Sequence, residues 1–191
     1  VPLVDWPAFQ LGLPAFMFLA TAWMLRQTRD GFAVRALEYA AIALIGVMGY
    51  YLQRHAFHVD ENVLFVKAGF FERGTITNSL FIYALVCLIA GRYWQRRAFT
   101  LGGAILCGAA LFRLCYFDML AYNPAFAPQE IGGVFFINAL LLPFGLPLLW
   151  ATLGSREMTQ AGLNRSARFV STLRLPLLFC LLSLNVRFLF H

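Results

Sequence analysis

Charged side chains are scarce in this sequence: 13% of its 191 residues are Asp, Glu, Lys or Arg, whereas 61% are hydrophobic. The mean hydropathy is +0.71. Soluble domains carry about 25% charged residues, so this composition excludes an ordinary soluble domain. It predicts instead a chain that lies within a lipid bilayer.

Paired cysteines and familiar catalytic motifs are also missing. The four cysteines all fall inside apolar runs and none forms a Cys-x-x-Cys pair, so we interpret them as packing residues and not as disulfides or zinc ligands. No Ser-His-Asp order or glycine-rich phosphate loop stands out, and no signal peptide or initiator Met opens the chain. Because no catalytic motif stands out, we predict no catalytic residue and no cofactor. Because no Met opens the chain, we expect either a processed protein or, in preference, a piece of a longer polypeptide.

Long apolar runs dominate what is there. A membrane-spanning helix needs about 20 apolar residues, and we predict six such spans. They cover residues 7–25, 33–52, 75–94, 98–117, 132–153 and 170–189. Proline lies inside three of them, at Pro14, Pro147 and Pro176, where we expect a kink or the end of a half-helix. The predicted fold class is an all-α, polytopic transmembrane helical bundle.

Arginines mark one set of connections between these spans. Those that flank the first, third and fifth connections are Arg26, Arg29 and Arg35, then Arg92, Arg96 and Arg97, then Arg156, Arg165 and Arg168. Because basic connections stay in the cytoplasm, we predict that both ends of the fragment are extracytoplasmic. We interpret the formal net charge of +6 as a topology signal, and we expect no nucleic-acid partner.

An internal repeat links the two halves of the chain. The pattern Arg-x-x-Phe-His occurs at residues 54–58 and again at 187–191, and the same offset of 133 residues places Gly12-Leu13-Pro14 on Gly145-Leu146-Pro147. Coincidences at one offset indicate a repeat. We predict a four-span unit at residues 1–134 and the first two spans of a second, parallel unit at residues 135–191.

Three further motifs carry a resemblance to a known family. They are Tyr122-Asn123-Pro124, then residues 129–132 (Gln-Glu-Ile-Gly), and Asn138 with the Leu run that follows it. With the closing Arg-x-x-Phe-His, the chain resembles the bacterial multi-spanning membrane proteins catalogued as domain of unknown function 2339. The resemblance implies a polytopic protein of the bacterial inner membrane with more helices than this fragment contains. It brings no catalytic residues with it.

Polar side chains expected at the extracytoplasmic face are the candidate binding residues. In Arg-x-x-Phe-His the Arg, Phe and His share one helix face, so the cation and the imidazole could bind an anionic lipid or glycan. The favoured alternative is that the Arg anchors its helix in the headgroup layer, the Phe packs, and the His caps the C-terminal carbonyls. The candidate set is Arg54, His58, Arg113, Asp118, Asn123, Arg187 and His191.

A metal site at the same face is a weaker hypothesis. His55, His58, Asp60, Glu61 and the distant His191 offer ligands, but their spacing is loose and lacks a His-Glu-x-x-His core. We therefore predict a hydrated loop there and no metal.

Glu38, Arg113 and Arg174 are charged residues that lie inside predicted spans. A charge at that depth costs about 3 kcal/mol on insertion scales and needs a partner or water. We predict that Glu38 pairs with Arg174, and that Arg113 folds toward Asp118 or Glu72. Such pairs are either structural or line a transport path.

Three functions remain open at this point. The first is a non-enzymatic scaffold or binding module of the bacterial cell envelope that docks a partner protein, an anionic lipid or a glycan. The second is a transporter or flippase subunit built around Glu38, Arg113 and Arg174. The third is a membrane-embedded transferase with His58 as general base. Expected partners are membrane lipids, an envelope protein, or further repeats of the same chain.

Overall fold

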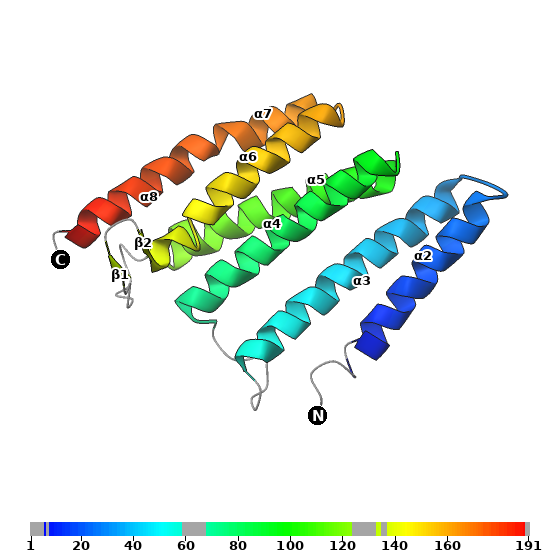
Figure 1. Ribbon diagram of the computed structural model, residues 1–191, viewed down its shortest axis with the longest axis horizontal. Coiled ribbons are helices and arrows are strands. Elements are labelled where there is room, and N and C mark those ends of the chain that lie inside the picture. The colour runs from blue at the N-terminus through cyan, green and yellow to red at the C-terminus, as the bar shows by residue number, and fades with distance from the viewer. Residues whose placement is uncertain (1–5, 7, 59–67, 124–132, 135–136, 190–191) are drawn as a thin grey trace.

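The computed structural model describes residues 6, 8–58, 68–123, 133–134 and 137–189 and shows an all-α bundle (Figure 1). The first half contains η1 (Ala8–Gly12), α2 (Leu13–Arg26), α3 (Phe32–Phe57), α4 (Phe70–Tyr93), α5 (Arg97–Arg113) and η2 (Leu114–Ala121). The second half contains β1 (Gly133–Val134), β2 (Ile137–Asn138), η3 (Ala139–Leu141), α6 (Gly145–Gln160), α7 (Asn164–Thr172) and α8 (Arg174–Leu189). β1 and β2 pair antiparallel over only two residues each, so helices define the fold.

The long helices run side by side as three hairpins, α2 with α3, α4 with α5, and α6 with α7 and α8 (Figure 1). The turns within these hairpins, at residues 27–31, 94–96 and 161–163, all lie at one end of the bundle. The arginines of the first, third and fifth connections gather around these turns, and we call this the basic end. α3 ends, α4 begins and α8 ends at the opposite end.

Within the residues that the structure describes, four helices are long and apolar enough to span a membrane: Phe32–Phe57, Phe70–Tyr93, Arg97–Ala121 and Asn164–Arg187. Their most apolar windows have a mean hydropathy of 1.6 to 1.7. Each overlaps one of the predicted spans, and the predicted all-α polytopic fold is confirmed. The chain is therefore a membrane-embedded helical protein.

The predicted fifth span, 132–153, is not a continuous helix. Gly133–Val134 and Ile137–Asn138 form the short antiparallel pair, and α6 begins only at Gly145 and runs on to Gln160. Pro143 explains the late start, because a proline lacks the amide hydrogen that a helix interior requires. Pro147 is tolerated because it lies in the first turn of α6.

The other two span prolines also lie at helix boundaries. Pro14 is the second residue of α2, directly after the π-helical turn η1. Pro176 follows an interruption at Leu173 that separates α7 from α8. Since a proline removes one backbone hydrogen bond and crowds the preceding turn, both interruptions have a local cause, as the sequence predicts.

Small residues let α4 and α5 approach each other closely. A Cβ atom on Gly103 would lie 2.8 Å from the carbonyl oxygen of Ala84, and one on Gly91 would lie 2.5 Å from the amide nitrogen of Thr100. Neither position has room for a side chain. The two helices therefore form the rigid centre of the bundle.

The main hydrophobic core joins α4 and α5 to the third hairpin and leaves out the first. Its buried members include Leu88, Leu111, Met158, Val170 and Leu177, which come from α4 to α8. Among the described residues, no member of this cluster belongs to α2 or α3. The α2–α3 hairpin must therefore be held against the bundle largely by other contacts.

The helix bounds agree with the proposed repeat. An offset of 133 residues would carry Leu13–Arg26 onto residues 146–159 and Phe32–Phe57 onto residues 165–190. α6 covers the first of these ranges, and α7 with α8 covers nearly all of the second. The parallel repeat itself stays a prediction.

Candidate functional site

A groove of about 690 Å³ lies between the α2–α3 hairpin and the α4–α5 hairpin. Its walls are mainly apolar and include Leu19, Ile42, Ile45, Val86, Ala90 and Phe99. Binding sites for small molecules are typically about 300–1,000 Å³ in volume and mostly apolar, with a few polar groups. The groove therefore has the size and the lining of a ligand site.

Polar contacts bridge α3 and α4, one at the groove and one beyond the residues that line it. Near the middle, the Tyr83 hydroxyl donates to the Ile42 carbonyl oxygen at 2.7 Å. Further along, the Ser79 hydroxyl donates to the side-chain oxygen of Gln53 at 2.6 Å. The Arg96–Glu38 ion pair lies at the basic end of the groove, and a second buried ion pair, Arg54–Glu72, lies beyond the groove at the other end of α3. Hydrogen bonds and ion pairs thus hold the first hairpin in place where the core cluster does not.

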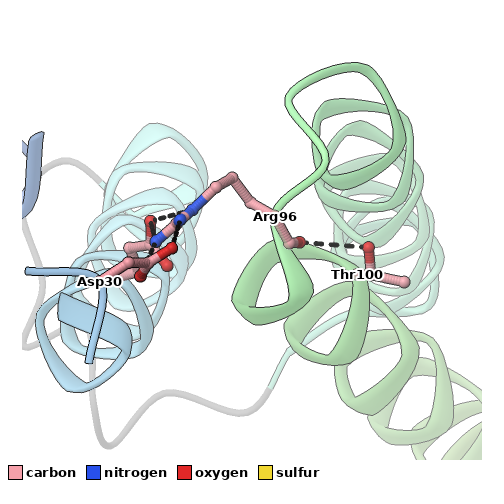
Figure 2. Close-up of polar contacts among 4 residues, drawn as sticks. Asp30, Arg96 and Thr100 are labelled. Atoms are coloured by element: carbon pink, nitrogen blue, oxygen red, sulfur yellow. Dashed lines mark hydrogen bonds and ion pairs between the residues drawn. The ribbon is translucent and has the colours of Figure 1, made fainter. Parts of the chain in front are cut away.

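Arg96 forms the ion pairs at the basic end. Its Nε donates to Glu38 Oε1 at 2.7 Å and its Nη2 lies 2.6 Å from the same oxygen, while Nη1 lies 2.7 Å from Asp30 Oδ2. Figure 2 shows the side chain reaching from the α4–α5 turn toward Asp30, while the Arg96 carbonyl oxygen accepts a hydrogen bond from the Thr100 hydroxyl. One guanidinium therefore ties both carboxylates to the turn that begins α5.

Local backbone geometry helps to place Arg96. The residue before it, Gln95, adopts a φ of +54°, and Arg96 itself is extended before α5 begins. The side chain of Arg96 is 8% exposed and that of Glu38 is also 8% exposed, whereas that of Asp30 is 48% exposed. Of the two ion pairs that Arg96 forms, only the one with Glu38 is therefore buried.

The charges at this end stabilise one another. The hydrogen bond from Arg96 holds the pKa of Asp30 below its ordinary value, and the same hydrogen bond raises the pKa of Arg96. Glu38 Oε2 is buried and has no hydrogen-bond partner within the part of the chain that the structure describes. Since a buried carboxylate oxygen normally accepts a hydrogen bond, Oε2 leaves one acceptor beside the groove for a water molecule or a ligand.

Glu72 forms the ion pair at the opposite end. Arg54 Nη1 lies 2.5 Å from Glu72 Oε1, and His58 Nε2 lies 3.0 Å from Glu72 Oε2. The side chains of Arg54 and Glu72 are 5% and 4% exposed. We call Arg54, His58 and Glu72 the Glu72 cluster. It joins the last turn of α3 to the first turn of α4.

A second buried polar cluster lies between α4 and η2. The Thr77 hydroxyl lies 2.9 Å from Asp118 Oδ2, and Arg113 Nε donates to the Thr77 hydroxyl at 3.2 Å. The guanidinium of Arg73 stacks over the ring of Tyr122, 4.3 Å from its centre. Both arginines interact electrostatically with Asp118. The expected approach of Arg113 to Asp118 is thus present, mediated by Thr77.

The predicted pair of Glu38 and Arg174 is wrong. Glu38 pairs with Arg96, while Arg174 Nε donates to the Ser171 carbonyl oxygen at 3.1 Å and its guanidinium also contacts the Ser171 hydroxyl. The physical reason is the order of the helices. α3 packs against α2, α4 and α5, whereas α8 packs against α6 and α7.

The other candidate residues do not converge on one surface. Arg54 and His58 meet at Glu72, and Arg113 and Asp118 meet at Thr77. The Asn123 amide donates to the Met119 carbonyl oxygen at 2.9 Å, and Arg187 is exposed in the last turn of α8. His191 lies outside the described residues, as do Asp60 and Glu61 of the metal hypothesis.

Sequence reasoning missed the groove and the roles of Asp30 and Arg96. Arg96 stands among exposed arginines in a connection, so it could be counted only as a topology signal. One signal was available in the sequence. Asp30 is the single acidic residue in the connection between the first two predicted spans, where the other charged residues are arginines. The groove has no local motif, because its apolar lining has the same composition as the core.

No family model, curated protein or solved structure matches this chain. Its class therefore follows from its own composition and fold: the protein is a multi-pass, membrane-embedded helical bundle.

Proposed function

We propose that the protein is a non-enzymatic, membrane-embedded binding module, and that its groove holds the acyl chains of a membrane amphiphile. The observation that carries this proposal is the groove of about 690 Å³ between two hairpins that the hydrophobic core does not join. Three of the helices that line it, α3, α4 and α5, belong to candidate membrane spans. Acyl chains are therefore the molecules that surround it.

The polar groups of the groove favour one orientation of the ligand. Arg26, Glu38 and Arg96 lie toward the basic end, together with the indole rings of Trp23 and Trp94. Trp is enriched at membrane–water interfaces, and arginine binds phosphate groups there. The polar head of the amphiphile is thus expected at the basic end, with its chains directed toward Ile45 and Tyr83.

Contacts at the opposite end favour a structural role for the residues first considered for docking. Arg54 and His58 both engage Glu72, and all three are largely buried. Docking of a partner protein or an anionic glycan through Arg54 and His58 would therefore have to break these contacts.

The charge distribution also bears on the transporter hypothesis. The clusters around Arg96 and around Asp118 occupy different ends of the bundle, and buried apolar residues of α4 such as Phe81, Ala84 and Leu88 separate them. A polar path between the two ends would have to pass this stretch. Binding without transport is the simpler consequence.

Localisation in a bacterial inner membrane with the basic end in the cytoplasm belongs to the same proposal, as do the parallel repeat and the family resemblance. The clustering of arginines at one end supports the orientation, since basic connections remain in the cytoplasm. The matching helix bounds support the repeat.

Filling the groove tests the proposal. Ala90 lines the groove, whereas Ala109 is exposed on α5 away from it, so Ala90→Trp and Ala109→Trp form a matched pair. Native mass spectrometry of protein extracted gently from its membrane should show lipid adducts on the wild type and on Ala109→Trp. Ala90→Trp should carry fewer lipid adducts than either, because the groove is filled, while keeping its helix content. Identical adducts on all three folded proteins would contradict the proposal.

A further inference from the structure

A second pocket, of about 520 Å³, lies at the basic end between α6 and α7. These two helices lie side by side at the tip of the third hairpin, away from the apolar groove (Figure 1). The residues that line it are polar or charged, apart from Ala167, and include three arginines: Arg156 from α6, Arg168 from α7, and Arg174 from the start of α8. We call it the arginine pocket.

Helix geometry explains why these side chains converge. α7 turns Ala167 and Val170 into the core, which leaves Arg168 and Ser171 on its outer face, three residues apart and therefore neighbours. The interruption at Leu173 then starts α8 at Arg174. The guanidinium of Arg174 contacts Ser171, which fixes it beside the pocket.

Positive charge in the arginine pocket is not balanced by its own lining. Among the described residues that line it, none is Asp or Glu. The adjacent acid on α6, Glu157, forms an ion pair with Arg92 of α4, with 3.3 Å between Oε2 and Nη2. Three guanidinium groups around one cavity repel one another, so an anion between them would lower the electrostatic energy.

The charged hydrogen-bond donors of the pocket are its guanidinium groups. The hydroxyls of Ser155 and Thr159 already donate to carbonyl oxygens of their own helix, each at 2.9 Å. A guanidinium offers planar, paired N–H groups that match the oxygens of a phosphate. The N-terminus of α7 adds the positive end of a helix dipole at Asn164.

We propose that the arginine pocket binds a phosphate group, and that its natural source is the headgroup of an anionic phospholipid in the leaflet at the basic end. Asn164–Arg187 is a candidate span, so its first turns lie where lipid phosphates are expected. Basic pockets between helices at this depth are suited to anionic headgroups. This site is separate from the groove and does not depend on it.

The test compares two double variants that remove the same charge from the same end. Arg156→Gln with Arg168→Gln removes two guanidinium groups from the lining of the pocket. Arg29→Gln with Arg165→Gln removes two exposed arginines that do not line it. The full chain is placed in phosphatidylcholine nanodiscs that contain spin-labelled phosphatidylglycerol. The fraction of label immobilised by the protein gives its relative affinity for the anionic lipid.

We expect the relative affinity for phosphatidylglycerol to fall about ten-fold in the pocket variant, which corresponds to about 1.4 kcal/mol of binding free energy. The control variant should keep the wild-type affinity. Equal losses in both variants would show that the lipid responds only to the general basic charge, and would overturn the proposal. So would wild-type affinity in both. Circular dichroism and size-exclusion chromatography check that each variant is folded. The single variant Arg168→Lys keeps the positive charge but lacks the planar guanidinium, so it separates the contribution of charge to the affinity from that of paired hydrogen bonds.

A second arm identifies the source of the phosphate. Phenylglyoxal modifies accessible arginines, and mass spectrometry locates the modified peptide. Protection of Arg156 and Arg168 by phosphatidylglycerol but not by inorganic phosphate supports a lipid headgroup. Protection by inorganic phosphate alone in detergent supports a soluble phosphate ligand instead. Modification that neither probe reduces would contradict a phosphate site.

Discussion

Replacing Arg96 by Met should detach the basic end of the first hairpin. The change leaves Glu38, whose side chain is 8% exposed, without the guanidinium that lies 2.6 Å from its Oε1. Removing one partner of a buried ion pair costs about 3–5 kcal/mol, because the other charge stays buried and unpaired. The contact with Asp30 adds little to this figure, since that carboxylate is half exposed. We therefore expect the free energy of unfolding to fall by about 3–5 kcal/mol.

Reversible unfolding by sodium dodecyl sulfate in mixed micelles measures this loss. Tryptophan fluorescence is a suitable signal, because Trp23 and Trp94 line the groove near Arg96. Arg92→Met is the matched control. Arg92 also pairs with a glutamate, but its side chain is 43% exposed, so its loss should cost no more than about 1 kcal/mol.

A companion variant separates the buried charge from the lost contact. When Glu38→Met is added to Arg96→Met, no charge of the pair remains buried, and most of the stability should return. If Arg96→Met were as mild as Arg92→Met, or if the double variant were as unstable as the single one, the Arg96–Glu38 pair would not hold the hairpin as described.

Other contacts give predictions of the same kind. Glu72→Met alone should lower the free energy of unfolding by about 3–5 kcal/mol, and adding Arg54→Met should recover most of the loss in a double-mutant cycle. Gly103→Val should cost at least about 1–3 kcal/mol in detergent unfolding because a Cβ there meets backbone, whereas Gly108→Ala, with nothing within 4 Å, should be tolerated. The pKa of Asp30 is lowered in the folded state, so its ionised form stabilises the protein above the ordinary value of 3.8, and this stability disappears as the pH falls through the lowered pKa. Asp30→Asn should therefore melt at a lower temperature than the wild type at pH 7. The two melting temperatures should converge in strongly acidic buffer, where Asp30 is protonated in both the folded and the unfolded state.

The helical class of this protein could be predicted from its sequence because composition alone decides it. Hydrophobic runs of about 20 residues have few structural alternatives in a bilayer. The prolines also acted as expected, since Pro14 and Pro176 lie beside real interruptions. The start of α6 at Gly145 was missed, because an apolar run such as residues 132–144 indicates burial without requiring a helix.

Partner choice among the buried charges could not be predicted in the same way. Glu38 pairs with Arg96 and not with Arg174 because α3 lies against α5, and apolar helices carry no local signal that selects their neighbours. Glu72 was considered only for Arg113, although it joins Arg54 and His58 across the connection between α3 and α4. Each of these choices depends on helix packing, which emerges only when the whole bundle is assembled.

Photo-cross-linking tests the central proposal, a groove that holds acyl chains, most directly. Protein in nanodiscs is irradiated with a phospholipid that carries a diazirine on one acyl chain, and mass spectrometry locates the labelled peptides. Preferential labelling near Ile45 and Val86, which falls with excess unlabelled lipid and disappears in Ala90→Trp, is the result that we predict. Labelling spread evenly over lipid-exposed positions such as Ile105, and unchanged in Ala90→Trp, would contradict it.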